Sequence, residues 1–158
     1  MSQRKAIRMD DQAVEAFIAA NVRARISTLD RSGAPRVVPV SYVVLDGRVV
    51  FWADEGSQKV VNLRRDPRVA CIIDDGVEFH EFRGVEICGQ AELRDDVDTT
   101  VRVNDLFCAK VPEEWREAAR AVLTELAAER IVVAINAERV NSWDHSKMPG
   151  LRPQDVGR

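Results

Sequence analysis

The hydrophobic positions of this chain follow two spacings, and each spacing predicts a different kind of element. Apolar residues recur at helical spacing in four stretches, residues 10–21, 57–66, 95–110 and 112–129. β-Branched runs predict six strands, residues 23–29, 36–45, 48–53, 68–73, 82–93 and 130–135. Asp46 and Gly47 suit a two-residue hairpin turn, because both central positions of such a turn need a positive φ. Hairpins with few helices favour a mainly β fold, an antiparallel barrel with helices packed outside it.

The helix predicted from residue 57 lies between two strands and is the most informative stretch of the sequence. Ser57 can cap this helix, because its hydroxyl can accept a hydrogen bond from a free backbone N–H, and Pro67 stops it. Ser57, Gln58 and Lys59 then stand at a helix N-terminus, where free N–H groups and the helix dipole favour an anion. The pattern fits a phosphate site at the end of a strand. An ordinary capped helix with a surface lysine would show the same residues.

Three residues within the predicted strands mark irregular positions. Pro39 cannot donate a hydrogen bond to a strand ladder, so it indicates an edge, a bulge or a place where a ligand approaches the backbone. Gly84 and Gly89 indicate bends or bulges in the long strand 82–93. Beyond the last predicted strand, we expect a tail from Val140.

Length and charge restrict the classes of protein that this chain can belong to. With 158 residues it has the size of one domain, and we expect residues 1–158 to form a single domain whose end is frayed from about residue 150. The formal net charge of -3 gives no global case for nucleic acid or an anionic membrane. No segment approaches the roughly 20 apolar residues of a membrane span, and the start does not resemble a signal peptide. An odd number of cysteines without a CxxC motif indicates buried, reduced thiols and a cytoplasmic protein.

Most familiar catalytic motifs are missing from the sequence. The two histidines, His80 and His145, lie far apart, so we expect no metal site. There is no G-x-S-x-G, HExxH or G-x-G-x-x-G motif. The tail, in contrast, gathers Trp143, His145 and Lys147 within a few residues. Either the tryptophan pins the terminus onto the barrel, or the tail reaches a ligand across a dimer interface.

Several of these segments together resemble a known family, the pyridoxamine 5'-phosphate oxidase-like superfamily of flavin- and deazaflavin-binding split β-barrels. The most specific part is the pattern Ser-x-Lys-x-x-Asn-Leu-x-x-Asp-Pro-Arg-Val, which begins at Ser57. The resemblance extends over roughly residues 17–148 and includes the segments 36–42, 50–53, 82–93 and 142–147. It implies a six-stranded antiparallel split barrel, and a homodimer that binds two cofactors in clefts between its subunits.

The resemblance also implies which residues contact the cofactor. Those beside the ring system would be Arg36, Val37, Val38, Pro39, Val40, Trp52 and Ala53. Those at the cofactor phosphate would be Ser57, Gln58 and Lys59, and those from the tail would be Trp143, His145 and Lys147. Oxidase members often have an arginine where this chain has Gln58. No catalytic side chain is assigned, and the two candidates for an acid are Tyr42 and His145.

Within this superfamily the chain is most similar to the branch that uses the deazaflavin coenzyme F420. The phosphate-helix pattern and the Trp-Asp-His-Ser-Lys tail carry this similarity. It implies a reductase that transfers hydride between F420 and an unsaturated small molecule. Two alternatives stay open: an oxidase or flavin reductase that uses FMN, and a carrier that holds a cofactor or heme without turnover.

Overall fold

The computed structural model describes residues 3–148 of the chain, so the predicted fraying from residue 150 lies outside the described residues. The strands are β1 Arg23–Leu29, β2 Pro35–Ser41, β3 Val43–Leu45, β4 Arg48–Asp54, β5 Arg68–Asp75, β6 Arg83–Arg94 and β7 Arg130–Asp144. The α-helices are α1 Gln3–Ala6, α2 Asp11–Ala20, α3 Gln58–Arg65, α4 Val97–Ala109 and α5 Arg116–Ala127. Short 3₁₀ turns cover Phe79–Glu81, Glu113–Trp115 and His145–Lys147.

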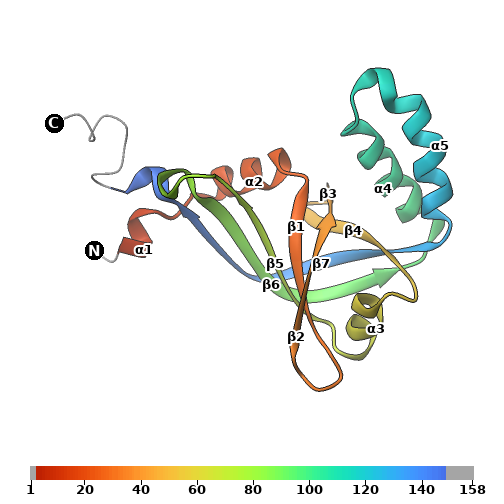
Figure 1. The fold of residues 1–158 in the computed structure, drawn as a ribbon, viewed down its shortest axis with the longest axis horizontal. Helices are drawn as coiled ribbons and strands as arrows, with labels where there is room; N and C mark the ends of the chain where they lie inside the picture. The colour runs from red at the N-terminus through yellow and green to blue at the C-terminus, as the bar shows by residue number, and fades with distance from the viewer. Residues whose placement is uncertain (1–2, 149–158) are drawn as a thin grey trace.

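The strands form one curled antiparallel sheet in the order β2-β1-β5-β6-β7-β4-β3 (Figure 1). Its two edge strands, β2 and β3, are halves of one chain segment separated only by Tyr42. β2 pairs with β1 and β3 pairs with β4, so this one segment joins the two ends of the sheet. This arrangement confirms the mainly β fold of the split-barrel type with flanking helices.

The predicted number of strands, six, is wrong, because the segment 36–45 is interrupted. The N–H of Tyr42 donates to the carbonyl of Val22 instead of extending a ladder (3.1 Å). The Tyr42 side chain is fully buried in the core. The seven strands therefore arise from one bend in an otherwise continuous strand.

Two hydrophobic clusters lie on opposite faces of the sheet. Phe51 and Ala53 of β4 point into the interior of the barrel, which is closed by Phe17 of α2 and by Val60 and Leu63 of α3. The alternate residues, Val50 and Trp52, belong to a second cluster with Val103, Leu106, Phe107, Leu123 and Ala127. The hairpin of α4 and α5 therefore covers the outer face of β3, β4 and β7.

The tail predicted from Val140 is instead the second half of β7. Residues 140–144 pair with residues 83–87 of β6, and β7 has 15 residues in all. The ladder shifts register between Cys88 and Gly89, which confirms the predicted bulge at Gly89. The predicted hairpin turn is also confirmed, because Asp46 and Gly47 both have a positive φ. No helix among the described residues is both long and apolar enough to cross a membrane.

Candidate functional site

A cleft of about 340 Å³ lies where β2, β4 and the start of β7 meet α3 and the α4–α5 hairpin. Its volume falls within the usual range of small-molecule sites. The cleft is lined by Pro39, Val40, Ser41, Trp52, Ala53, Asp54, Lys59, Phe107, Leu123 and Arg130. The structure thus brings together five residues that the sequence assigned to a cofactor, Pro39, Val40, Trp52, Ala53 and Lys59.

Helix α3 begins at this cleft. Ser57 is its N-cap, as predicted, and the Ser57 N–H donates to the carbonyl of Asp54 (2.9 Å). The hydroxyl of Ser57, however, makes no capping hydrogen bond and is buried without a partner among the described residues. Lys59 is half-buried at the first turn and forms no ion pair with any carboxylate that the structure describes. A hydroxyl and an ammonium group, neither with a partner of this kind among the described residues, therefore lie beside the helix N-terminus.

The other polar residues of α3 hold the helix on the barrel. The side chain of the fully buried Asn62 donates to the hydroxyl of Thr28 on β1 (3.0 Å). Gln58 Nε2 donates to the side-chain oxygen of Asn62, Oδ1 (2.9 Å), so the Gln58 amide is directed along the helix. The structure thus gives Gln58 a bond within the helix, whereas the resemblance placed it at the phosphate.

Trp52 has an unpaired donor in the same region. The residue is 8% exposed, and its indole Nε1 has no hydrogen-bond partner among the described residues. Its ring packs against Phe107, with 4.8 Å between ring centroids. A buried N–H without a partner costs free energy, which a ligand acceptor would recover. The two unpaired polar atoms, Trp52 Nε1 and Ser57 Oγ, fit a ligand that has acceptor groups.

Strand β2 forms the open side of this region. It is an edge strand that pairs only with β1, as Pro39 predicted. Val37 and Val38 are 61% and 37% exposed, which is unusual for valines in a strand. Pro39 and Val40 line the cleft, and Arg36, Val37 and Val38 continue the same edge away from it. An apolar edge with unpaired backbone groups suits a flat ring with a polar rim.

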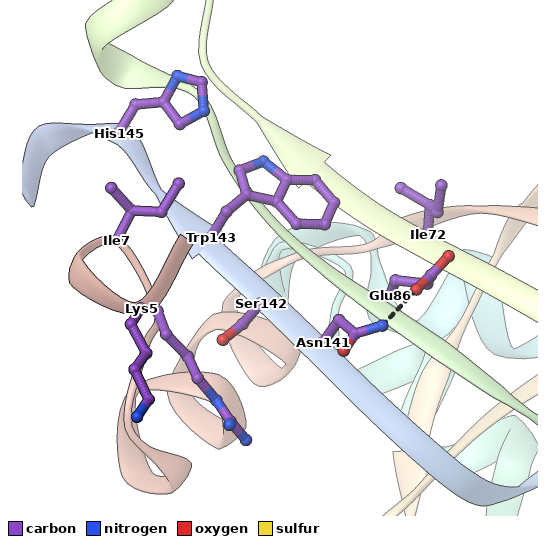
Figure 2. A pocket seen from close by; sticks show the side chains of 9 residues that line it. Lys5, Ile7, Ile72, Glu86, Asn141, Ser142, Trp143 and His145 are labelled. Carbon is purple, nitrogen blue, oxygen red and sulfur yellow. Dashed lines mark hydrogen bonds between the residues drawn. The ribbon is translucent and has the colours of Figure 1, made fainter. Parts of the chain in front are cut away.

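The tail residues lie elsewhere in this chain. Trp143 and His145 line a larger cavity of about 800 Å³, together with Asn141 of β7 and with Ile72 and Glu86 of the neighbouring strands β5 and β6 (Figure 2). Lys147 donates to the carbonyl of Arg8 (3.2 Å). Arg130 and Trp143 are separated by roughly 40 Å along β7. Within one chain, the structure therefore does not bring Trp143, His145 or Lys147 to the cleft.

Both residues suggested as acids are held by structural contacts. The Tyr42 hydroxyl donates to the carbonyl of Ile18 (2.5 Å), and burial raises the pKa of this phenol. His145 Nδ1 lies 2.9 Å from the carbonyl oxygen of Phe79, and its ring packs against the rings of Phe79 and Phe82. Neither residue lines the cleft. The cleft residues missed from the sequence are Ser41, Asp54, Phe107, Leu123 and Arg130.

This geometry defines the class of protein. It is a split barrel in which a helix N-terminus and a lysine lie beside an open strand edge. The family model described as pyridoxamine 5'-phosphate oxidase matches residues 10–144. The chain therefore belongs to the pyridoxamine 5'-phosphate oxidase family.

Solved structures agree with this assignment. The conserved hypothetical protein Rv2991 from Mycobacterium tuberculosis is 30% identical with a TM-score of 0.81, over 93% of this chain and 92% of that one. A FAD-binding protein from Mesorhizobium loti is 20% identical with a TM-score of 0.63, over 85% and 94%. The heme storage protein HutZ from Vibrio cholerae is 12% identical with a TM-score of 0.65, over 85% and 96%. At 20% and 12% identity, these two similarities are evidence for the fold. No protein of curated function matches the chain significantly.

Proposed function

We propose that the cleft binds a ring-shaped redox cofactor with a phosphate-bearing tail, and that the protein is a reductase that uses coenzyme F420. One observation supports this most: Lys59 and Trp52, whose indole Nε1 is unpaired among the described residues, line one cleft beside an open strand edge, and the unpaired Ser57 Oγ lies at the N-cap of the helix that carries Lys59. If these groups had only a structural role, we would expect each of them to have a hydrogen-bond partner within the protein.

Each part of the site has a distinct task in this proposal. Ser57, Lys59 and the first turn of α3 hold the phosphate through charge-assisted hydrogen bonds. The edge formed by Arg36 to Val40 supports the ring, and the cluster around Trp52 and Phe107 excludes water from it. The bound cofactor supplies hydride transfer, while the protein supplies binding and orientation. No side chain of the cleft has to act as an acid.

The choice of F420 rests on the sequence similarity to the deazaflavin branch and on the position of Gln58. Its amide bonds to Asn62, so α3 offers one cation, Lys59, at its first turn. FMN is the alternative, favoured by the fold shared with a FAD-binding protein. Heme has less support, because no histidine is among the described residues that line the cleft.

We also propose that two copies associate and that the tail of one subunit completes the cleft of the other. The outer face of β5, β6 and β7 supports this, because Ile72, Glu86 and Asn141 lie side by side in register beside the large cavity. Light scattering would give the mass of a dimer. A monomer at micromolar concentration would contradict this arrangement.

Fluorescence titration tests the cofactor directly. The purified protein should bind F420 at micromolar concentration and bind FMN more weakly. Reduced F420 should then be oxidised when unsaturated small molecules are added. Saturable binding without any such oxidation would instead support a carrier, and no binding of either cofactor would contradict the proposal.

A further inference from the structure

The cleft contains a second cation that neither the sequence pattern nor the family match assigns to a ligand. Arg130 begins β7 and is the register partner of Asp54, the last residue of β4. Its side chain alternates with the buried Ile131, so it lies on the same face as Val132 and Trp52. This places Arg130 in the cleft together with Lys59, although 70 residues separate the two in sequence.

The pairing of Arg130 leaves most of its donors free. Arg130 forms its ion pair with Asp54 through Nε, which lies 3.2 Å from Asp54 Oδ1, and it pairs with no other carboxylate that the structure describes. The Arg130 side chain is 30% exposed and that of Asp54 is 70% exposed, so Arg130 is the more buried partner of the ion pair. A guanidinium with a free fork is suited to two parallel hydrogen bonds with a phosphate.

The charges that line the cleft also favour an anion. Lys59 and Arg130 are positive, and Asp54 is the one negative side chain in the described lining. With Gln58 turned toward Asn62, a phosphate would receive a second positive charge from β7 instead of from α3.

We propose that Arg130 is a second anchor for the phosphate-bearing tail of the cofactor, and that Asp54 competes with the tail for Arg130. This inference rests on the proposed function, because it concerns the same cleft. It predicts opposite effects for the two partners of one ion pair. Removal of Arg130 weakens binding of the phosphate, whereas removal of the Asp54 charge strengthens it.

Matched ligands separate the tail from the ring. Dissociation constants are measured for F420 and for its precursor without the phosphate tail, and likewise for FMN and riboflavin. Arg130→Gln should weaken binding of the phosphate-bearing ligand of each pair about tenfold. Asp54→Asn should strengthen binding of the same ligand about threefold. For the ligands without phosphate, the dissociation constants should change less than about twofold in either variant. Arg102→Gln is the control, because it removes the same charge from an exposed ion pair with Asp46 outside the cleft.

The outcomes distinguish this inference from the proposed function. If the wild type prefers the phosphate-bearing ligands and both variants keep that preference, Arg130 is not an anchor and the cofactor proposal stands. If no ligand of either pair binds the wild type, both fail. Thermal unfolding checks whether Arg130→Gln folds. If it does not fold, the Asp54→Asn variant decides. An unchanged or weaker affinity of that variant for the phosphate-bearing ligands would contradict the proposal that Asp54 competes with the phosphate for Arg130.

Discussion

The indole of Trp143 lies against the backbone of Gly84, its register partner across the β6–β7 ladder. A Cβ on Gly84 would overlap the six-membered ring of that indole. Gly84 is not among the glycines with a positive φ, so it is the absence of a side chain, and not an unusual backbone conformation, that requires glycine here. At the end of β7, an aromatic ring thus packs directly on the backbone of β6.

Gly84→Ala should lower the free energy of unfolding by about 1–3 kcal/mol, because the added methyl group would overlap the indole of Trp143 and force it to move. Denaturant unfolding followed by tryptophan fluorescence measures this change. Gly56→Ala is the matched control, since a Cβ there would meet nothing within 4 Å. Equal stability of the two variants would contradict the close contact.

The sequence was sufficient where local pattern decides structure. Ser57 and Pro67 delimit α3, and Asp46 and Gly47 form the predicted turn, because each depends on residues close in sequence. The second half of β7 was missed because residues 136–140 are all exposed and show no alternation. That half is a strand only because β6 pairs with it.

The cleft was predictable in part for the same reason. Lys59 belongs to a recognisable local motif. Phe107 and Leu123, in contrast, have the spacing of ordinary core residues on two helices, and Arg130 reads as the start of a strand. Their position in one cleft depends on the register of β4 against β7 and on the packing of the α4–α5 hairpin, neither of which a local pattern contains.

Lys59→Ala should weaken F420 or FMN binding by about 1–3 kcal/mol, the scale of a charge-assisted hydrogen bond. Its effect on the free energy of unfolding should be small, because Lys59 pairs with no carboxylate that the structure describes. Fluorescence titration gives the dissociation constant, and thermal unfolding checks the fold.

The control for Lys59 is Arg64→Ala. Arg64 stands in the last turn of the same helix, where it pairs with Glu55 at 2.6 Å outside the cleft. The substitution Arg64→Ala also removes one positive charge from α3, but Arg64 does not line the cleft. If both substitutions weaken binding equally, the effect is general electrostatics and Lys59 does not bind the phosphate.

Tyr42→Phe separates a structural role from a catalytic one. Loss of the hydroxyl that donates to Ile18 should destabilise the protein by about 0.5–1.5 kcal/mol. Burial raises the pKa of this phenol, so it stays neutral at physiological pH. The rate of cofactor oxidation per folded molecule should be unchanged in stopped-flow measurements, and a rate lowered about tenfold or more would restore Tyr42 as an acid.

The three cysteines are free thiols, as predicted, but their environments differ. Cys71 and Cys108 are buried, and Cys88 is half-buried. At pH 8 a thiol reagent should therefore label Cys88 alone in the native protein and all three in denaturant. Cys88→Ser should abolish the native labelling, and fast labelling of Cys71 would contradict its burial.

Cys71 should also make stability depend on pH in the alkaline range. Burial raises the pKa of this thiol from 9.0 to about 12. Below pH 9 the thiol is protonated in both states and has no effect. Above pH 9 the unfolded chain releases this proton and the folded protein keeps it, so the free energy of unfolding falls by at most about 1.4 kcal/mol per pH unit.

Cys71→Ala should reduce this alkaline decline between pH 9 and about 12, measured by urea unfolding at a series of pH values. A residual slope should remain above pH 10, because burial also raises the pKa of Tyr42, which shares the same core. Cys88→Ala removes a half-buried thiol and is the control. If the decline is as steep in Cys71→Ala as in the wild type, the buried thiol is not its source, and Tyr42 has to account for the whole slope.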